Sequence, residues 1–398
     1  MTTLQKWWKI KNALNMKSKI KKMKIVFVRS VSLSRDIRTP KLIDTLSKYG
    51  FKCVLINWER EGVVNEHEKK ECVLLPLKIR APYGLGVVPF YIIWWIFVFV
   101  KLIKIKWDIV YAINFDSAVP AIILGKLMRR PVIYEILDVH EDQVELPWWI
   151  RTFTLGLDKL LLRLASAVVV VDELQILELG GVPNRNIYVI YDSPPHYFIK
   201  EEDVSKCTTS KKDAEFVLFY AGVLMEERAL NLDKLFEAVK EIENIKVVIA
   251  GYGDLVPQIL RWCNQMPDKM CFIGKISYED VIKRGMNADA FFILRSSTKK
   301  TNKYTCGSNL FNAMACGKPI IVNRGTSTAI KVAKAKCGIV VDANSVEEIR
   351  DAITKLKKNK KLCRRLGKNS RKAYETVYGW RIMENRLLKL CLSVIKKS

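Results

Sequence analysis

A glycine-containing loop and the helix start behind it form the stretch of this sequence best suited to binding an anion. Gly307 and Ser308 interrupt regular structure, and a short helix containing Leu310 is predicted to follow them. The residues before the loop, 290–294, are typical of a buried strand. Because free backbone N–H groups and the positive end of the helix dipole meet at a helix start, this unit favours a phosphate or carboxylate ligand.

A second candidate site is a dense cluster of polar residues after a predicted strand in the first half of the chain. Asp138, His140 and Glu141 directly follow the strand at 131–136. Asp116 follows the preceding strand and is expected to be the N-cap of the next helix. Polar residues at the carboxyl ends of neighbouring strands are typical of a catalytic crevice. Helix capping and solvation are the competing interpretation of these residues taken alone.

Strands alternate with helical segments in both halves of the chain, which predicts an α/β protein with two Rossmann-like, doubly wound domains. A chain of 398 residues is long enough for two separate cores. The predicted strands cover residues 24–29, 52–57, 109–113, 131–136, 167–171, 187–191, 216–220, 247–250, 270–273, 290–294, 319–322 and 338–341. The expected parts are a basic tail (1–22), a first domain (23–192), a linker (193–214), a second domain (215–378) and a terminal helix (379–398).

The chain is strongly basic, with 67 lysine and arginine residues against 41 acidic residues. This excess favours an anionic partner such as lipid headgroups, nucleic acid or a phosphorylated substrate, while a general compositional bias toward lysine explains it equally well. The hypothesis of a nucleic-acid-binding protein rests on charge alone, because no recognised nucleic-acid motif is present. Ten scattered cysteines without a CxxC pair, and three histidines, argue against a metal site and fit a reducing, cytoplasmic compartment.

Two segments of the first domain favour contact with a membrane surface. Residues 1–24 combine eight lysines with Trp7 and Trp8 and contain no acidic residue. An interfacial segment on anionic lipid has this composition, and a disordered tail or a start of translation at Met23 are the alternatives. Residues 90–100 are continuously apolar, with three lysines close behind. The run is too short to span a bilayer, so a buried or interfacial helix is expected.

The second half of the chain resembles the nucleotide-sugar site of glycosyltransferase family 4, which has the GT-B fold. Ala313, Met314 and Ala315, with Gly317 and Pro319 behind them, match the Glu-Ala-Met-Ala helix of that family and its trailing glycine and proline. The order of the matches along residues 24–395 adds to the resemblance, although each single motif is degenerate.

Matches also occur in the first half. The run at 138–141 is similar to an Asp-x-His-Glu sequence of the family, and Asp116 resembles an aspartate after its preceding strand. Asp36 and Arg38 resemble the Asp-x-Arg that precedes the family's first helix. An N-cap aspartate and a solvated arginine are the alternative interpretation of that pair.

The resemblance implies two domains facing a central cleft, with the terminal helix at 379–398 crossing back to the first domain. It also implies sugar transfer with retention of anomeric configuration, without a metal ion or cofactor. The implied donor is a nucleotide-diphosphate sugar, and the implied acceptor is a glycan or a polyprenyl-linked molecule, used on the inner face of a membrane. The implied catalytic residues are Asp116, Asp138, His140 and Glu141. The implied donor-binding residues are Gly222, Arg228, Gly251, Gly253, Tyr304, Gly307, Ser308, Asn309, Leu310 and Asn312.

The chain departs from the family pattern at the donor site. Tyr304 and Asn312 stand where the family has the two glutamates of its Glu-x7-Glu motif. Val223 replaces an arginine of the diphosphate loop, and Arg228 replaces a lysine there, so one cation is retained. Asn312 is expected to hydrogen-bond a ribose hydroxyl, and His140 to orient the sugar. A catalytically inactive GT-B protein, which binds a sugar nucleotide or supports a partner, is the alternative hypothesis.

Overall fold

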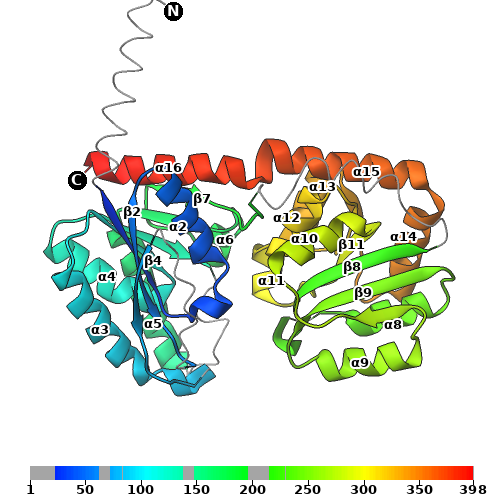
Figure 1. Ribbon diagram of the computed structural model, residues 1–398, viewed down its shortest axis with the longest axis horizontal. Coiled ribbons are helices and arrows are strands. Elements are labelled where there is room, and N and C mark those ends of the chain that lie inside the picture. Colours follow the sequence, from blue (N-terminus) through cyan, green and yellow to red (C-terminus); the bar gives the residue numbers. More distant parts are fainter. Residues whose placement is uncertain are drawn as a thin grey trace, which may run out of the picture. The chain divides into compact units, whose positions relative to one another are not determined.

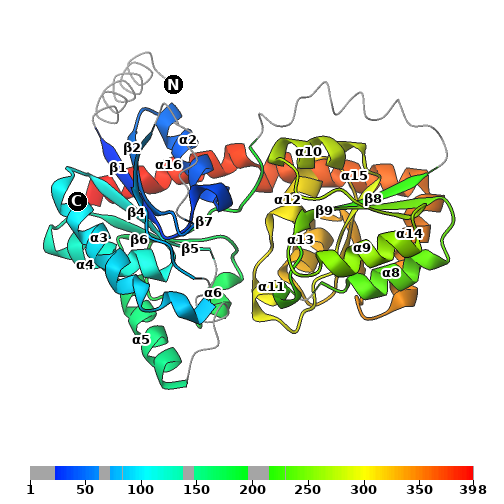
Figure 2. The same ribbon diagram turned by 60° about the horizontal axis from the view of Figure 1, so that its bottom comes forward.

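The computed structural model describes residues 23–61, 72–82, 84–137, 148–195, 215–228 and 230–397. The chain divides into two compact units, both drawn in Figures 1 and 2. One unit contains the described residues up to Ile190 and those from Glu384 onward, and the other is Tyr191–Met383. The predicted linker at 193–214 lies mostly outside the described residues.

The first unit is built on a seven-stranded sheet with parallel pairing throughout, in the order β3-β2-β1-β4-β5-β6-β7. The strands are β1 (Lys24–Arg29), β2 (Lys52–Trp58), β3 (Cys72–Leu77), β4 (Ile109–Ile113), β5 (Val132–Ile136), β6 (Ala167–Val170) and β7 (Ile187–Val189). The residues of β1, β2, β4, β5 and β6 are almost all buried on both faces, which explains the nearly continuous apolar runs of these strands in the sequence. The strand order reverses between β1 and β4, the position where such sheets form a ligand crevice.

Helices cover both faces of this sheet (Figure 1). They are α2 (Arg38–Lys48), α3 (Phe90–Lys104), α4 (Phe115–Leu127), α5 (Trp148–Leu164), the short α6 (Gln175–Glu178) and the later part of α16 (Trp380–Lys397). α3, α4 and α5 contribute to one apolar core with alternate strand residues, and α4 packs against both α3 and α5. No helix among the described residues combines the length and the apolar character needed to cross a bilayer.

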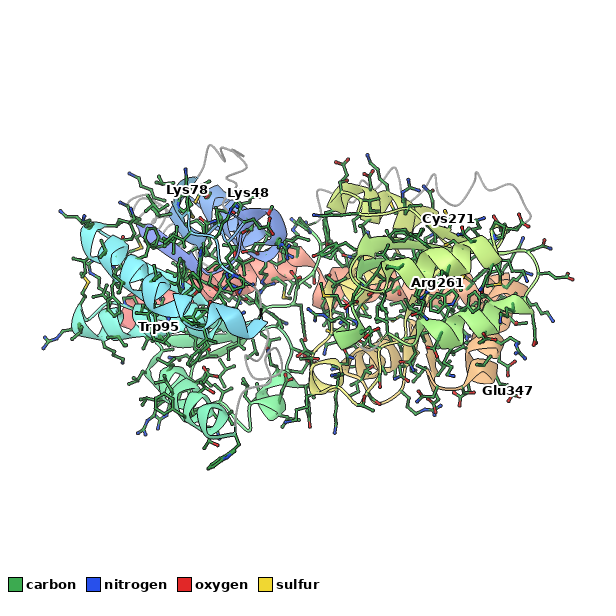
Figure 3. All side chains as sticks on the ribbon, turned by 90° about the horizontal axis from the view of Figure 1, so that it is seen from below. Lys48, Lys78, Trp95, Arg261, Cys271 and Glu347 are labelled. Carbon is green, nitrogen blue, oxygen red and sulfur yellow. The ribbon has the colours of Figure 1, made fainter. Side chains whose placement is uncertain are left out.

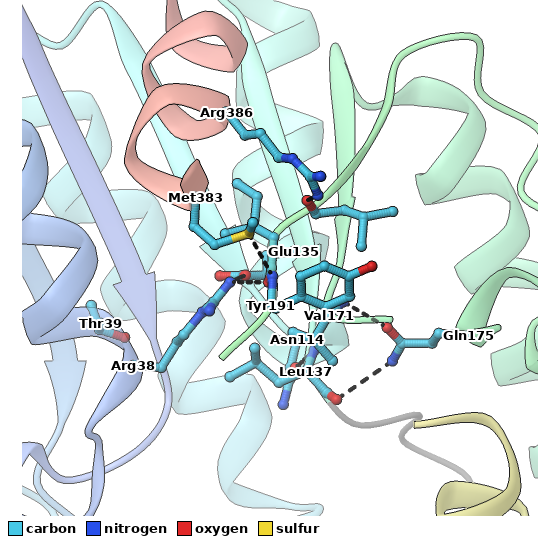
Figure 4. Close-up of polar contacts among 12 residues, drawn as sticks. Arg38, Thr39, Asn114, Glu135, Leu137, Val171, Gln175, Tyr191, Met383 and Arg386 are labelled. Atoms are coloured by element: carbon cyan, nitrogen blue, oxygen red, sulfur yellow. Dashed lines mark hydrogen bonds and ion pairs between the residues drawn. The ribbon is translucent and has the colours of Figure 1, made fainter. Parts of the chain in front are cut away.

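A buried ion pair joins α2 to the centre of the first sheet (Figure 4). Arg38 is 4% exposed, and its Nη2 lies 2.6 Å from Oε1 of the fully buried Glu135 and 2.8 Å from the backbone oxygen of Ile190. Asp36 accepts hydrogen bonds from the N–H groups of Arg38 and Thr39 at the start of α2. Asp36 stands one residue before the N-cap Ile37, so its interpretation as the N-cap is wrong although its carboxylate binds N–H groups of the first turn. The interpretation of Arg38 as a solvated side chain is wrong as well.

The second unit contains a six-stranded parallel sheet in the order β10-β9-β8-β11-β12-β13. The strands are β8 (Phe216–Val223), β9 (Ile245–Tyr252), β10 (Met270–Phe272), β11 (Ala290–Ile293), β12 (Ile320–Asn323) and β13 (Gly338–Val341). Counted from β8, this is the strand order 3-2-1-4-5-6 of a Rossmann-like domain. Its crevice position therefore falls at the carboxyl ends of β8 and β11.

Helices cover both faces of the second sheet as well. They are α8 (Leu232–Lys240), α9 (Val256–Gln265), α10 (Tyr278–Asn287), α11 (Lys300–Tyr304), α12 (Ser308–Ala315), α13 (Ser327–Ala335), α14 (Val346–Lys358) and α15 (Lys360–Ala373). α8 and α14 pack together over a core that includes the stacked rings of Tyr220 and Phe292. α12 packs against α10 and α15. A π-helical turn, Tyr374–Tyr378, then leads into α16.

Every strand predicted from the sequence is present, with ends that shift by up to three residues. The predictions missed β3 and α11. Gly317 follows the C-cap of α12 with φ of +64°, a left-handed conformation that ends the helix. Asp116 is not the N-cap of α4, because Asn114 takes that position with φ of 65° and places Asp116 in the first helical turn.

Candidate functional site

The carboxyl ends of β8 and β9 approach each other so closely that two positions require glycine. Gly251 has φ of +149°, and a Cβ there would lie 1.9 Å from the backbone oxygen of Gly222. Gly253 has φ of +146°, and a Cβ there would lie 2.2 Å from the backbone oxygen of Leu224. The N–H of Leu224 donates to Tyr252 O at 2.9 Å, which holds the strand ends together. These glycines therefore form a rim without side chains, where a ligand can approach the backbone.

Helix α12 begins close to this glycine rim with free hydrogen-bond donors. Gly307 is its N-cap residue. The backbone N–H groups of Ser308 and Asn309 donate to no described residue. The Asn309 side chain is also buried, at 7% exposure, and its Nδ2 lies 3.1 Å from where a Cβ of Gly222 would be. The start of α12 therefore supplies N–H donors at the edge of the sheet where an anionic ligand is expected.

Two arginines lie in the loops around the start of α12. Arg228 ends a short 3-10 helix after β8, and Arg295 follows β11. The Arg295 guanidinium lies 3.2 Å (Nη1) and 3.3 Å (Nη2) from where a Cβ of Gly307 would be. Neither guanidinium has a hydrogen bond or an ion pair with any described residue, and both Nε atoms are buried. The unpaired Arg295 guanidinium beside the start of α12 favours binding of a phosphorylated ligand.

Asn312 lies inside the second unit rather than on its surface. It is 2% exposed, and its Oδ1 accepts a hydrogen bond of 2.7 Å from the hydroxyl of Tyr278 on α10. The Nδ2 of Asn312 donates to no described residue. Tyr278 therefore leaves the amide of Asn312 as a hydrogen-bond donor, whereas a carboxylate at this position would act as an acceptor.

The remaining predicted donor residues have different environments. Leu310 is fully buried, and its N–H donates to Gly307 O at 3.3 Å, so it packs beneath the helix start. Tyr304 ends α11 as a partly buried residue, with the Lys303 ammonium 5.3 Å from the centre of its ring. Its hydroxyl has no hydrogen-bond partner among the described residues.

The predicted residues of the first unit are described only in part. Asp116 is 5% exposed, and its backbone oxygen accepts a hydrogen bond of 2.8 Å from the indole N–H of Trp95. Burial, together with the nearby Asp116 carboxylate, raises the pKa of Tyr91 above its usual range. Asp138, His140 and Glu141 lie outside the described residues.

Hydrogen bonds hold the backbone at Leu137, the last described residue before Asp138. The N–H of Leu137 donates to Oδ1 of Asn114 at 2.9 Å. Its carbonyl accepts a hydrogen bond of 3.4 Å from Nε2 of Gln175, whose Oε1 accepts from the N–H of Val171 at 3.0 Å (Figure 4). The ends of β4, β5 and β6 are thereby connected through side-chain amides.

The predicted donor residues thus gather at the carboxyl edge of the second sheet, whereas Asp116 belongs to the first unit. The sequence interpretation missed three residues at this edge: Tyr278, Arg295 and Asn302. Asn302 is 3% exposed, and its Nδ2 donates to the backbone oxygens of Arg228 (3.1 Å) and Ser296 (3.0 Å). The sequence does contain a signal that could have identified Arg295, namely an arginine directly after a predicted buried strand.

Residues 201–373 match the family described as glycosyl transferases group 1. This region contains the glycine rim, both arginines and the start of α12. The match thus covers the candidate site of the second unit and leaves the first unit unmatched.

Two curated relatives were found over parts of the chain. An uncharacterized glycosyltransferase of Methanocaldococcus jannaschii is 26% identical over 230 residues, covering 56% of this chain and 57% of the relative. The GDP-mannose-dependent monoacylated alpha-(1-6)-phosphatidylinositol monomannoside mannosyltransferase of Corynebacterium glutamicum is 24% identical over 166 residues, covering 40% of this chain and 43% of the relative. The chain therefore spans about half the length of the curated relatives it matches.

Solved structures match nearly the whole chain, whereas the curated sequences match only parts of it. A sucrose-phosphate synthase from Thermosynechococcus elongatus has a TM-score of 0.75 at 15% identity, covering 95% of this chain and all of that one. The HepE protein of Anabaena in complex with UDP has a TM-score of 0.70 at 16% identity, covering 93% of this chain and all of that one. These similarities establish the GT-B fold, as the sequence predicted.

We expect Tyr278→Phe to destabilise the second unit by about 1–3 kcal/mol, because the buried Oδ1 of Asn312 loses its donor. The free energy of unfolding from denaturant titrations measures this effect. Tyr304→Phe is the matched control, since its hydroxyl has no described partner. Equal stability of the two variants would show that the Tyr278 hydroxyl does not hold Asn312.

Proposed function

We propose that this chain is a retaining glycosyltransferase that moves a sugar from a nucleotide-diphosphate sugar to a glycan or lipid-linked acceptor. The observation that carries the proposal is the match of residues 201–373 to glycosyl transferases group 1, because it includes every described loop of the candidate donor site. The GT-B likeness to structures bound to UDP and to UDP-glucose supports a nucleotide-sugar donor.

In this proposal the second unit binds the donor and stabilises the leaving diphosphate. Arg228 contacts the diphosphate and neutralises the charge that develops as the sugar leaves. The free N–H groups at Ser308 and Asn309 add hydrogen bonds to the same oxygens. Asn312 reaches a ribose hydroxyl through its Nδ2, because Tyr278 occupies its Oδ1.

The first unit would hold the acceptor and complete the reaction. The leaving phosphate accepts the proton of the acceptor hydroxyl, so the reaction needs neither a strong protein base nor a metal ion. His140 would orient the sugar or stabilise its developing positive charge, with Asp116, Asp138 and Glu141 nearby in the acceptor site. These roles follow from the family resemblance of the sequence.

An inactive GT-B protein that binds a sugar nucleotide is the second candidate function. It is favoured by the replacement of both motif glutamates, by Tyr304 and Asn312. The structure adds that Asn312 is committed to Tyr278 through the oxygen atom that an accepting residue would use.

A panel of nucleotide sugars tests the proposal. We expect one sugar nucleotide to raise the melting temperature, because ligand at about 100 times its dissociation constant adds about 2.7 kcal/mol to the unfolding free energy. The same donor should then be consumed in the presence of glycan or polyprenyl-phosphate acceptors. Binding without turnover with any acceptor would favour the inactive protein, and absence of binding by every donor would contradict both.

We expect Arg228→Ala to lower turnover by about 100-fold, which corresponds to the loss of roughly 3 kcal/mol of charge stabilisation in the transition state. The measurement is kcat/KM with the donor identified by the panel. Arg350→Ala is a control in the same unit, because Arg350 pairs with Glu241 away from the site, at 3.0 Å. Turnover like that of the unmodified chain in a folded Arg228→Ala protein removes the assignment.

We further propose that the first unit docks on an anionic membrane surface. The outer side of α3 exposes Ile92 (61%), Ile96 (59%) and Ile103 (63%), which share one side of the helix. The two tryptophans of α3 contact the protein rather than solvent. Trp94 is fully buried, and Trp95, which Figure 3 labels, donates its indole N–H to the backbone oxygen of Asp116 on α4.

Other helices of the first unit also expose large apolar residues. α4 exposes Leu127 (75%), and α5 exposes Trp148 (79%) and Phe153 (70%). Lys101 and Lys104 occupy the last turn of α3. Apolar residues edged by lysines fit the headgroup region of an anionic bilayer.

The acceptor and the compartment belong to the same proposal. One curated relative is named for a lipid acceptor, a phosphatidylinositol mannoside, which supports a lipid-linked acceptor for this chain. The nine described cysteines are free thiols, in keeping with a reducing compartment. We therefore place the reaction on the cytoplasmic face of a membrane.

We expect the full chain to co-sediment with anionic vesicles at low salt and to be released at high salt, because each lysine near such a surface contributes about 1 kcal/mol within a Debye length of roughly 10 Å. Replacing Ile92, Ile96 and Ile103 by serine should weaken vesicle binding at least tenfold. Ile330→Ser, at a 55% exposed isoleucine of the second unit, is the control.

Two results would overturn docking. One is a full chain that ignores anionic vesicles at low salt. The other is unchanged binding after deletion of residues 1–22 combined with replacement of Lys101, Lys104 and Lys106 by glutamine.

A further inference from the structure

Arg295 is a cation at the donor site that no sequence motif identifies. It directly follows β11 and the buried Leu294, at the carboxyl edge of the second sheet. Its Nη1 and Nη2 atoms lie 3.2 and 3.3 Å from where a Cβ of Gly307 would be, so the whole guanidinium lies against the N-cap residue of α12. A Cβ at position 307 would be in tight contact with this guanidinium, so the two residues are direct neighbours.

The backbone of Arg295 is fixed from two sides. Its carbonyl accepts a hydrogen bond of 2.8 Å from Nδ2 of Asn323, which is 4% exposed. A bridge between Leu230 and Arg295, and the bond from Asn231 N to Leu294 O at 2.9 Å, join it to the loop after β8. The side chain therefore projects from a rigid base, which limits the entropy lost when it binds a ligand.

The loop after β8 carries a second cation, Arg228, whose backbone is tied to the segment after β11. Asn302 donates to the backbone oxygens of both Arg228 and Ser296, the residue after Arg295. The two arginine-bearing loops are thus held by one buried amide. Both guanidinium groups have a buried Nε atom without a hydrogen bond, and neither is paired with a described carboxylate.

The other groups at this edge are donors as well. The N–H groups of Ser308 and Asn309 are free, and the 93% buried Asn309 side chain has no partner among the described residues although its Nδ2 lies against Gly222. Two cations, a helix start and a buried amide together favour a ligand with several negative oxygen atoms. A diphosphate has this character, with two adjacent phosphate groups.

We propose that Arg295 is the second diphosphate-binding cation of the donor site and supplies the charge that Val223 lacks. The comparison with Val223 rests on sequence position, because Val223 ends β8 where the resembling family has an arginine. Arg295 reaches the diphosphate from β11, the strand on the other side of the crevice position from β9. This inference rests on the proposed donor function and adds to it a residue that binds substrate.

Calorimetric titration of the full chain with UDP, GDP and ADP tests the inference. For the diphosphate that binds, we expect Arg295→Ala to weaken affinity at least tenfold, a change of about 1.4 kcal/mol. Arg295→Lys should recover part of the loss, because it keeps the charge without the fork of donors. The melting temperature without ligand should stay unchanged, which separates ligand binding from a structural role.

Arg261→Ala is the matched control, because Arg261 is an exposed arginine on α9 of the same unit (Figure 3). It should bind the diphosphate as the unmodified chain does. Equal affinity of Arg295→Ala and Arg261→Ala would overturn the role of Arg295 and leave the donor proposal intact. An Arg295→Ala protein that melts at a lower temperature but binds normally would also overturn it. If the unmodified chain binds no nucleoside diphosphate, the donor proposal itself fails.

Discussion

The candidate site depends on the close approach of two backbones, at the ends of β8 and β9. A Cβ at Gly251 would lie 1.9 Å from the oxygen of Gly222, so a side chain there would force the strands apart. Separation at this point would also move Leu224, whose N–H is bonded to Tyr252. The loop carrying Arg228 begins just beyond Leu224. The glycines thus fix both a surface open to the ligand and the base from which a cation extends.

The strands were predictable because parallel sheets covered on both faces impose continuous apolar runs. The missed strand β3 follows the same rule less clearly, since Val73 is 59% exposed and Pro76 interrupts the run. The cap of α4 was misassigned because two suitable residues stand close together. Asn114 adopts a positive φ and uses its side chain to bind Leu137, a contact between distant segments that local sequence does not reveal.

The site was predictable to the extent that its residues follow one another in the chain. The start of α12 and the glycines after β8 and β9 belong to contiguous motifs, and the structure gathers them at one edge. Arg295 and Tyr278 come from other strand and helix ends, so only the sheet order brings them there. Spacing within a motif carries no information about such neighbours, and this is why the sequence indicated one cation for a site to which we assign two.

The neutral residues at 304 and 312 set the charge balance of the donor site that we propose. Tyr304 and Asn312 stand where the resembling family has carboxylates, and the guanidinium groups of Arg228 and Arg295 are unpaired among the described residues. Without those two negative charges, the proposed site would attract a diphosphate more strongly and would lack strong acceptors for ribose or sugar hydroxyls. On this proposal, the binding free energy would come more from the phosphates than from the sugar and ribose. Such a site would retain its leaving-group stabilisation and would discriminate less among nucleosides through their hydroxyl groups.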